Sequence, residues 1–399
     1  MLKNKKKKLK GMLSLLISVC MLAASLSFSV SAVSVEGQGT NYPFVFVNGY
    51  WGYGEYDKFY KIMPYWGMQD GDVLEYLRDQ GYEAYAASVD PVRSARVRAC
   101  ELYAQLTGTV VDYGLAYSEK VGIERFGEDY SGRALFEGWG QADAQGKIKK
   151  VNLAGHSFGG ATIRLLSALL EAGDEAERAA TPVDDLSPLY AGGNGGLVHS
   201  ITTLASPHDG TSFGEAMPLI YTMAQAVGLT DIKGDIPSLL GIFDYLKAMS
   251  RAFAIGIGEG SGAYDITFKG AAELNAGIPT YEDIYYFSVP TDCTQPGPLG
   301  FRLPDPSKTD VIFLMTTLIS TLYAPDPAWQ ANDGLVNTVS AMAPKGEAQK
   351  EFDKNDISPG VWNVMPVFYG DHLAIVGGLT RPVEVKAFYL DIVETINVL

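Results

Sequence analysis

Short apolar runs alternate with amphipathic segments along much of the chain. Residues 42–47 form a nearly continuous apolar run, which is typical of a strand buried on both faces of a parallel sheet. By the same reasoning we predict further strands at 82–89, 148–154 and 198–205, and helices at 71–81, 98–117 and 160–172. Strands that alternate with helices specify an α/β fold with a mainly parallel central sheet flanked by helices.

Residues 210–260 interrupt this alternation. They hold Leu, Ile, Met and Phe side chains at helical spacing, with Gly and Pro at the joints. Any single helix of this kind is ordinary core. An insertion so rich in Met and aromatic residues between two strands also suits a mobile cover over an apolar site. We therefore predict a helical lid insertion at approximately 210–260.

The N-terminus has the pattern of a secretory signal. Six of the 31 Lys and Arg lie in the first ten residues, residues 11–30 carry no charge, and Val30-Ser31-Ala32 supplies small residues for cleavage. An uncleaved membrane anchor is the alternative, because about twenty apolar residues can span a bilayer. We predict a signal peptide at 1–32 and a secreted, extracellular domain at 33–399.

Composition and charge narrow the class of protein. Of the 399 residues, 47% are hydrophobic and 19% are charged, which is typical of a globular domain and excludes a disordered chain. The 46 acidic residues outnumber the 31 basic ones, so nucleic acids and anionic membranes are poor partners. Beyond the leader only Cys100 and Cys293 remain, and their pairing is left open.

The strongest chemical signal is the run Gly155-His156-Ser157-Phe158-Gly159. It follows a predicted strand and precedes a predicted helix, which is the context of a nucleophile elbow. In that turn the flanking glycines prevent collisions with neighbouring backbone, and the helix N-terminus lies behind the serine. Ser157 is therefore the candidate nucleophile.

A serine hydroxyl needs a base, and the chain offers four histidines. His372 lies in a loop before the last predicted helix, where the chain order Ser, acid, His of this arrangement places the base. His156 adjoins the serine and is expected to point away from it. His199 lies in an apolar strand pattern and is expected to be structural, whereas a function for His208 is left open.

The acid that orients the base must lie between Ser157 and His372 in the chain. Asp333 fits, since a glycine follows it and permits a tight loop. Asp310 and Asp326 are the alternatives, and as isolated acids they are expected at the solvated surface. Asp209 is a candidate brace for local structure.

Two backbone amides must stabilise the oxyanion. Phe158, which follows the nucleophile, supplies the first. Tyr50 supplies the second, because its glycine-flanked loop directly follows the first predicted strand. The aromatic residues in this loop suit a fatty acyl chain better than a charged substrate.

With these residues the chain resembles the secreted bacterial triacylglycerol lipases of the staphylococcal and thermophilic-bacillus type. The resemblance runs from Phe44 to the C-terminus. It implies an α/β-hydrolase fold with a helical lid, and ester hydrolysis through Ser157, Asp333 and His372. The motifs that carry it include Asn48-Gly49-Tyr50, Tyr65-Trp66-Gly67, Arg98-Ala99-Cys100, Gly155-His156-Ser157-Phe158-Gly159-Gly160, Ser206-Pro207-His208-Asp209-Gly210-Thr211, Asn332-Asp333-Gly334-Leu335-Val336 and Asp371-His372-Leu373.

The chain departs from this family at its metal sites. The resemblance implies a zinc ion held by two aspartates and two histidines, but three of the four corresponding residues cannot bind zinc. These four residues are Val97, Tyr117, Ile123 and Asp265.

It also implies calcium bound by carboxylates just after the catalytic histidine, but here Ala374 stands at the position of the glutamate and Leu379 lies near that of the aspartate. We therefore predict no metal and no cofactor. A further departure is Asn48, where the family usually has histidine, and a changed anchoring of the oxyanion loop is expected from it.

The sequence thus predicts a serine ester hydrolase, most simply a triacylglycerol lipase acting on a lipid ester at an oil–water interface, with no nucleic acid and no stable protein partner. A short-chain carboxylesterase or polyesterase is the alternative if residues 210–260 leave the site open. A catalytically silent lipid-binding protein is a third hypothesis, against which the intact set of Ser157, Asp333 and His372 argues.

Overall fold

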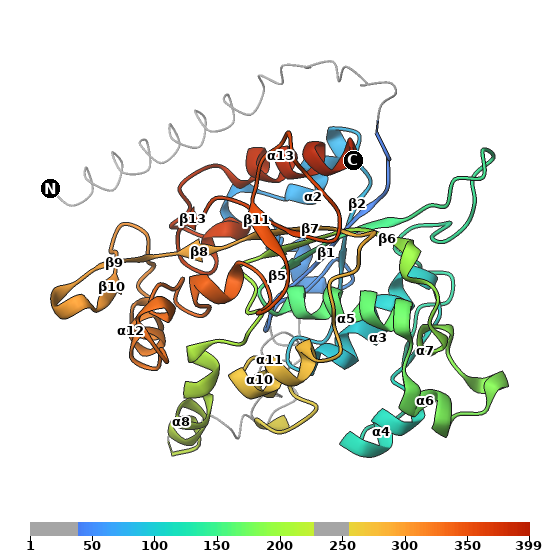
Figure 1. Ribbon diagram of the computed structural model, residues 1–399, viewed down its shortest axis with the longest axis horizontal. Helices are drawn as coiled ribbons and strands as arrows, with labels where there is room; N and C mark the ends of the chain where they lie inside the picture. The colour runs from blue at the N-terminus through green and yellow to red at the C-terminus, as the bar shows by residue number, and fades with distance from the viewer. Residues whose placement is uncertain (1–38, 227–254) are drawn as a thin grey trace, which may run out of the picture. The chain divides into compact units, whose positions relative to one another are not determined.

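A single parallel sheet organises the chain. The structure is a computed structural model that describes residues 39–226 and 255–399. Its central sheet has seven strands in the order β11-β12-β7-β6-β5-β1-β2, and every neighbouring pair is parallel (Figure 1). The strands are β1 (Phe44–Val47), β2 (Ala84–Ala87), β5 (Val151–His156), β6 (Val198–Leu204), β7 (Tyr285–Val289), β11 (Gln349–Glu351) and β12 (Trp362–Val364). The predicted α/β architecture with a mainly parallel sheet is confirmed.

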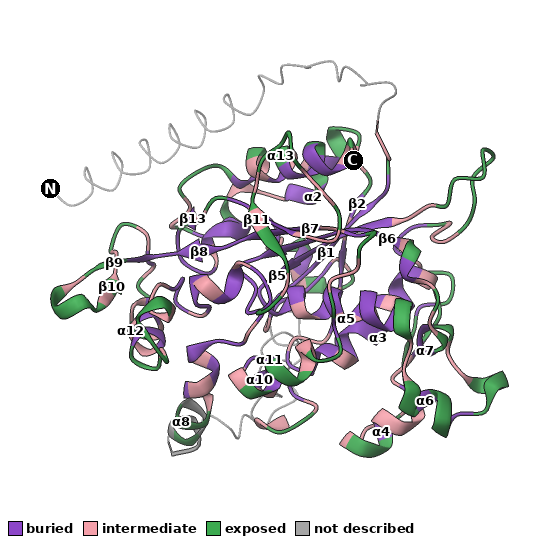
Figure 2. Cartoon of the chain, viewed as in Figure 1, coloured by how far each residue is buried: buried purple, intermediate pink, exposed green. Residues whose placement is uncertain are grey.

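Helices cover both faces of the sheet because its central strands are apolar on both sides. In β1, Val45 and Val47 belong to the core beneath α3 (Ala95–Thr107) and α5 (Phe158–Ala172). Phe44 and Phe46 belong to the opposite core, which α2 (Val73–Asp79) and α13 (Val385–Asn397) cover. Figure 2 shows the resulting buried layer running through the strands, with exposed residues on the outer helices and loops. Burial on both faces explains the unbroken apolar run at 42–47.

Shorter elements surround this framework. The remaining helices are α4 (Leu115–Val121), α6 (Glu175–Ala180), α7 (Pro188–Ala191), α8 (Ser212–Ala226), α10 (Gly262–Asp265), α11 (Phe268–Asn275) and α12 (Leu314–Leu322). Three small pairings join β3 (Val110–Asp112) to β4 (Phe126–Asp129), β8 (Thr291–Asp292) to β13 (Phe368–Tyr369), and β9 (Thr294–Pro296) to β10 (Arg302–Pro304). Single 3-10 turns occur at Lys58–Lys61, Met68–Asp70, Val183–Asp185, Gly195–Leu197, Pro298–Gly300, Pro327–Trp329, Thr338–Ala341 and Ala374–Val376.

The helix predicted at 98–117 is wrong as one element. The chain instead forms α3, the short strand β3 and α4. Gly108 ends α3 with a left-handed φ of 63°, and Gly114 has a φ of 89° before α4 begins. Both conformations are accessible to glycine, and the valines of β3 favour an extended backbone between them. The other predicted strands and helices are present with ends shifted by a few residues.

Two predicted segments lie wholly or mostly outside the residues that the structure describes. The signal peptide predicted at 1–32 and most of the insertion predicted at 210–260 lie outside the described residues, apart from α8 and residues 255–260. Within residues 39–226 and 255–399 no helix is long and apolar enough to cross a bilayer. Cys100 and Cys293 are buried and unpaired, so the pairing that the sequence left open does not occur.

Candidate active site

Ser157 lies at the sharp turn between β5 and α5. Its backbone has a φ of 54° and a ψ of −128°, a conformation that a non-glycine residue adopts only under constraint. The neighbouring backbone leaves no room for side chains. A Cβ on Gly155 would lie 2.5 Å from the carbonyl carbon of Gly159, and one on Gly159 would lie 2.2 Å from the carbonyl oxygen of Val47. The glycines of the predicted nucleophile elbow are therefore required by close packing.

The structure brings Ser157, His372 and Asp333 into one hydrogen-bond chain. Oγ of Ser157 lies 2.8 Å from Nε2 of His372, and Nδ1 of His372 lies 2.8 Å from Oδ2 of Asp333. Asp333 accepts a hydrogen bond from Nδ1–H of His372, which leaves Nε2 unprotonated and able to accept from the Ser157 hydroxyl. All three residues are buried, so solvent weakens the interactions little. This is the arrangement required for activation of a serine by a histidine base.

The carboxylate of Asp333 is fully buried, and hydrogen bonds compensate for its lost solvation. Its Oδ1 accepts the amides of Leu335 and Val336 at 3.0 and 2.8 Å. Its Oδ2 accepts the Thr291 hydroxyl at 2.5 Å in addition to His372. Thr291 was not predicted as part of the site. It begins β8, just after the end of β7, and no motif in its immediate sequence marks it as a partner of Asp333.

The loop after β1 brings the second predicted oxyanion amide to the serine. Tyr50, Phe158 and Ser157 line the same pocket, and a Cβ on Gly49 would lie 2.7 Å from Cβ of Ser157. Phe158 is the first residue of α5, where helix amides have no acceptor in a preceding turn. The helix N-terminus also favours negative charge at this point. Tyr50 and Phe158 therefore lie beside Ser157, and the role of their amides in holding an oxyanion stays a prediction.

Arg98, which was not predicted as a functional residue, contacts the segments that carry Tyr50 and Phe158. Its guanidinium is completely buried, donates to the carbonyl oxygens of Asn48 and Asp90 and to Oγ1 of Thr162, and lies 5.1 Å from the Phe158 ring centre. Burial lowers the Arg98 pKa to about 10. The arginine therefore fastens the oxyanion loop to α3 and α5.

Asn48 itself anchors that loop. Its Nδ2 donates to the carbonyl of Gly49 at 3.0 Å, and its side chain is fully buried. Its Oδ1 has no hydrogen-bond donor among the described residues. Asn48 thus binds the backbone beside Tyr50, and a change in loop anchoring relative to the family's histidine stays a prediction.

The other histidines and acids do not join the hydrogen-bond chain of Ser157. His199 is a buried residue between Tyr42 and Tyr285, as expected. His208 is buried between Thr203 and Arg164, and burial holds its pKa well below the usual value, so its place in the fold is structural.

The remaining acids lie away from Ser157. Asp326 is exposed and caps a 3-10 turn, and Asp310 is half-buried beside Asp371. Asp209 accepts hydrogen bonds from Asn275 and Lys345.

His156 adjoins Ser157 in the chain, yet its ring nitrogens contact other groups. Its Nδ1 lies 2.6 Å from the hydroxyl of Tyr65, and its Nε2 lies 3.0 Å from the carbonyl oxygen of His372. The sequence predicted that His156 points away from the serine, but it did not predict the contact between His156 and the His372 carbonyl. No local sequence signal reveals that contact.

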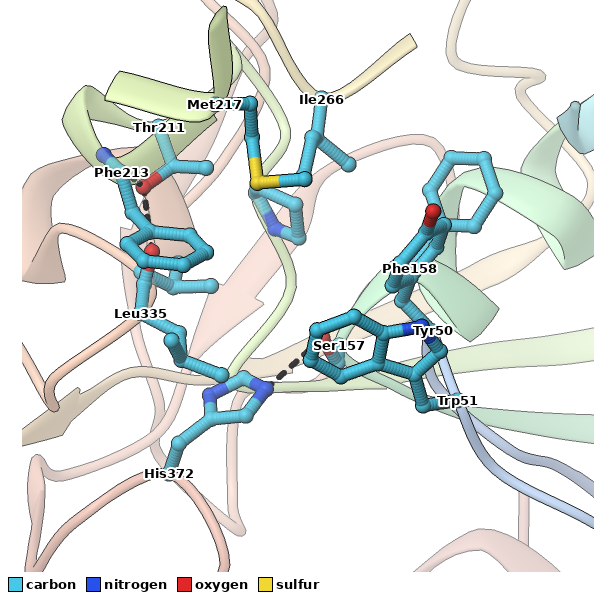
Figure 3. A pocket seen from close by; sticks show the side chains of 12 residues that line it. Tyr50, Trp51, Ser157, Phe158, Thr211, Phe213, Met217, Ile266, Leu335 and His372 are labelled. Atoms are coloured by element: carbon cyan, nitrogen blue, oxygen red, sulfur yellow. Dashed lines mark hydrogen bonds between the residues drawn. The ribbon is translucent and has the colours of Figure 1, made fainter. Parts of the chain in front are cut away.

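Apolar side chains form the walls around Ser157. Figure 3 shows Ser157 and His372 on one side of the pocket and Met217 and Ile266 across from them. Trp51, Phe213 and Leu335 also line it. Phe213 and Met217 belong to α8, so the described part of the predicted insertion contributes to the pocket. Such a wall favours an apolar acyl group over a charged one.

The residues at the family's zinc positions do not suit a zinc ion. Asp265 accepts the amide of Ala95 at 2.7 Å, and the Tyr117 hydroxyl lies 2.6 Å from Oγ of Ser94. The other two positions, Val97 and Ile123, have no ligand atom. At the calcium positions, Ala374 is buried in the core and Leu379 is exposed, and neither side chain carries the oxygen that calcium prefers.

This fold and site define the class of protein. A parallel sheet with a serine at the β5–α5 elbow, an acid and a histidine in later loops, and amides after β1 is an α/β hydrolase. Residues 40–396 match the family described as "Lipase-like, C-terminal domain". The chain therefore belongs to this family.

Individual relatives agree with this assignment. The chain is 35% identical over 355 residues to a lipase of Staphylococcus hyicus, and the match covers 84% of this chain and 53% of that protein. It is 34% identical over 360 residues to lipase 2 of Staphylococcus aureus, covering 84% of this chain and 50% of that protein. The chain thus spans about half the length of these relatives. The predicted resemblance to staphylococcal lipases is confirmed.

Solved structures share the fold. The crystal structure of S. hyicus lipase superposes with a TM-score of 0.73 at 32% identity, covering 90% of this chain and 96% of that chain. EstA from Clostridium botulinum superposes with a TM-score of 0.75 at 31% identity, covering 91% and 88%.

Replacing the buried acid should reduce turnover without unfolding the protein. In Asp333→Asn the amide retains the shape of the carboxylate but neither stabilises an imidazolium nor fixes the His372 tautomer. We expect kcat on dissolved p-nitrophenyl butyrate to fall about 10³- to 10⁴-fold. The matched variant Asp326→Asn, at the exposed alternative acid, should retain wild-type kcat. Retention of more than about a tenth of the activity in Asp333→Asn would contradict the assignment.

Chelation should leave the folded protein unchanged. An ion bound only by the native state raises its stability, and its removal lowers the melting temperature. Because the residues at both family positions lack suitable ligands, we expect EDTA to shift the melting temperature by less than about 1 °C. A drop of several degrees that added Zn²⁺ or Ca²⁺ reverses would show that a metal is bound.

Proposed function

We propose that this protein is a secreted, metal-independent serine ester hydrolase of the triacylglycerol lipase type. The observation that carries the proposal is the hydrogen-bond chain from Ser157 through His372 to Asp333 beside an apolar pocket. The similarity to staphylococcal lipases supports a lipid ester as substrate. The signal-like pattern at residues 1–32 supports secretion.

The reaction proceeds by acyl transfer to the serine. The Ser157 hydroxyl attacks the ester carbonyl while Nε2 of His372 takes its proton. The carbonyl oxygen becomes an oxyanion that the amides of Tyr50 and Phe158 hold, and Asp333 stabilises the imidazolium. His372 then protonates the departing alcohol, which leaves an acyl-enzyme. A water that gives its proton to His372 attacks this ester and releases the fatty acid and the serine.

A comparison of substrates tests this function. We expect the full chain to hydrolyse tributyrin and emulsified triolein with EDTA present, and Ser157→Ala to reduce either rate at least about 10³-fold. A rise in rate above the solubility limit of tributyrin would identify a lipase with a working lid. Activity confined to dissolved short esters would identify a carboxylesterase or polyesterase instead. Equal rates in both proteins would refute the serine mechanism and favour a silent lipid-binding protein.

An exposed apolar surface beside the pocket supports action at an oil–water interface. Helix α12 exposes Met315 and Leu322, at 66% and 71%, and Ile312, just before the helix, is 65% exposed, whereas Thr317 and Ser320 are buried. This helix packs against α8, which lines the pocket, and against the hairpin of β9 and β10 (Figure 1). Contiguous exposed apolar side chains mark surfaces that contact a partner or lipid.

Charges on this surface should separate binding to oil from chemistry. In the double variant Met315→Glu, Leu322→Glu we expect the rate on emulsified triolein to fall about tenfold or more, because each apolar side chain that enters lipid contributes about 1.5–3 kcal/mol. Hydrolysis of dissolved p-nitrophenyl butyrate should not change. Val183→Glu, at an 85% exposed position in another part of the surface, serves as the matched control. Equal loss on both substrates would exclude a docking role.

A further inference from the structure

A buried relay of hydrogen bonds connects the oxyanion loop to the loop of the candidate base. The amide of Gly49 lies 3.0 Å from the hydroxyl of Tyr65. That hydroxyl lies 2.6 Å from Nδ1 of His156, and Nε2 of His156 lies 3.0 Å from the carbonyl oxygen of His372. Gly49 precedes Tyr50, which carries an oxyanion amide. The relay therefore begins beside one part of the catalytic site and ends on another.

The backbone groups at its ends fix the direction of every hydrogen bond in the relay. The Gly49 N–H can only donate, so the Tyr65 oxygen accepts it and gives its own single proton to Nδ1 of His156. The carbonyl of His372 can only accept, so Nε2 of His156 carries the ring proton and donates it. The neutral Nε2–H tautomer of His156 is the form that satisfies both ends.

The surroundings keep His156 in that neutral form. Its side chain and that of Tyr65 are buried, and the Trp66 ring packs edge-on at 6.3 Å from the His156 ring. Burial and the nearby His372 hold the His156 pKa well below its usual value. The centres of the two histidine rings are 4.7 Å apart, so a charged His156 would oppose the imidazolium that must form on His372 during ester hydrolysis.

The two ends of the relay are otherwise held by separate parts of the fold. Asp333 binds His372 through the side chain and also through its own carbonyl oxygen, which accepts the His372 amide at 2.8 Å. Arg98 and Asn48 bind the carbonyl groups of the oxyanion loop. Of the contacts described above, the hydrogen bonds through Tyr65 and His156 are the ones that connect the His372 loop directly to the oxyanion loop.

We propose that Tyr65 and His156 are positioning residues that set the distance between the oxyanion amide of Tyr50 and the imidazole of His372. Neither touches the substrate, and both act through backbone groups. The inference rests on the proposed ester hydrolysis, because only during acyl transfer must the base and the oxyanion donor serve one reacting carbonyl. A small misplacement of such groups reduces the rate of the chemical step more than the binding of substrate.

Removal of either side chain should therefore lower kcat and leave KM nearly unchanged. On dissolved p-nitrophenyl butyrate we expect Tyr65→Phe and His156→Leu each to reduce kcat about 10- to 100-fold, with KM within about threefold of wild type. The double variant should be no slower than the slower single variant, because each substitution breaks the same relay.

A conservative variant supplies the rescue. In His156→Gln the amide oxygen can accept from Tyr65 and the amide nitrogen can donate to the His372 carbonyl, so the direction of the relay is preserved without a titrating ring. We expect His156→Gln to keep kcat within about fivefold of wild type, and to lose this advantage over His156→Leu when combined with Tyr65→Phe.

Tyr286→Phe is the matched control. Tyr286 lies in β7 and is also buried, and its hydroxyl also accepts a hydrogen bond from a backbone amide, that of Tyr281, at 3.1 Å. It should match Tyr65→Phe in its loss of melting temperature and keep wild-type kcat. Wild-type kcat in Tyr65→Phe, a change in KM alone, or an equal loss of kcat in Tyr286→Phe would overturn the inference. If wild type and Ser157→Ala have equal rates, the proposed function fails, which is a different result from any of these.

Discussion

The close approach of backbone to backbone around Ser157 is the constraint on which the rest of the site depends. The serine keeps its strained positive-φ conformation because β1, β5 and α5 meet at Gly155 and Gly159 with no space for a Cβ. That meeting requires parallel neighbours on both sides of β5, which the sheet order provides. The same contact brings the end of β1, and with it the oxyanion loop, to the serine. The strained turn and the position of the loop that carries Tyr50 thus have the same structural cause.

Buried polar groups form the second layer of the site, and each is placed by the fold around it. The carboxylate of Asp333 is compensated by two amides, a threonine hydroxyl and His372, while Arg98 is compensated mainly by backbone carbonyl groups. An uncompensated buried charge costs several kcal/mol, so these partners are required for the folded state as well as for geometry. Rigidity here follows from satisfied hydrogen bonding as much as from apolar packing.

The sequence predicted β1, β2, β5 and β6, because strands buried on both faces carry a nearly continuous apolar pattern, but it did not place β7, β11 or β12. It also identified the residues that meet at the serine, since the elbow motif and the chain order of nucleophile, acid and base are local signals. It failed at 98–117, where two glycines divide an apparently continuous helical pattern. It assigned no role in the site to Thr291, Tyr65 or Arg98, although Tyr65 and Arg98 lie in motifs shared with the lipase family. Their contributions depend on contacts between distant segments, which the local sequence does not reveal.

The two buried thiols have a practical consequence for the study of this protein. Cys100 lies on the buried face of α3 with its sulfur 3.2 Å from the Tyr190 hydroxyl, and Cys293 lies beside the acid loop, next to Thr317. Burial raises the pKa of Cys100 to about 11 and that of Cys293 to about 12, so both are poor nucleophiles in the native state. Alkylation at neutral pH therefore requires local opening of the structure. The alkylation rate of Cys100 reports opening of the sheet core, and that of Cys293 reports opening of the loop that carries Asp333.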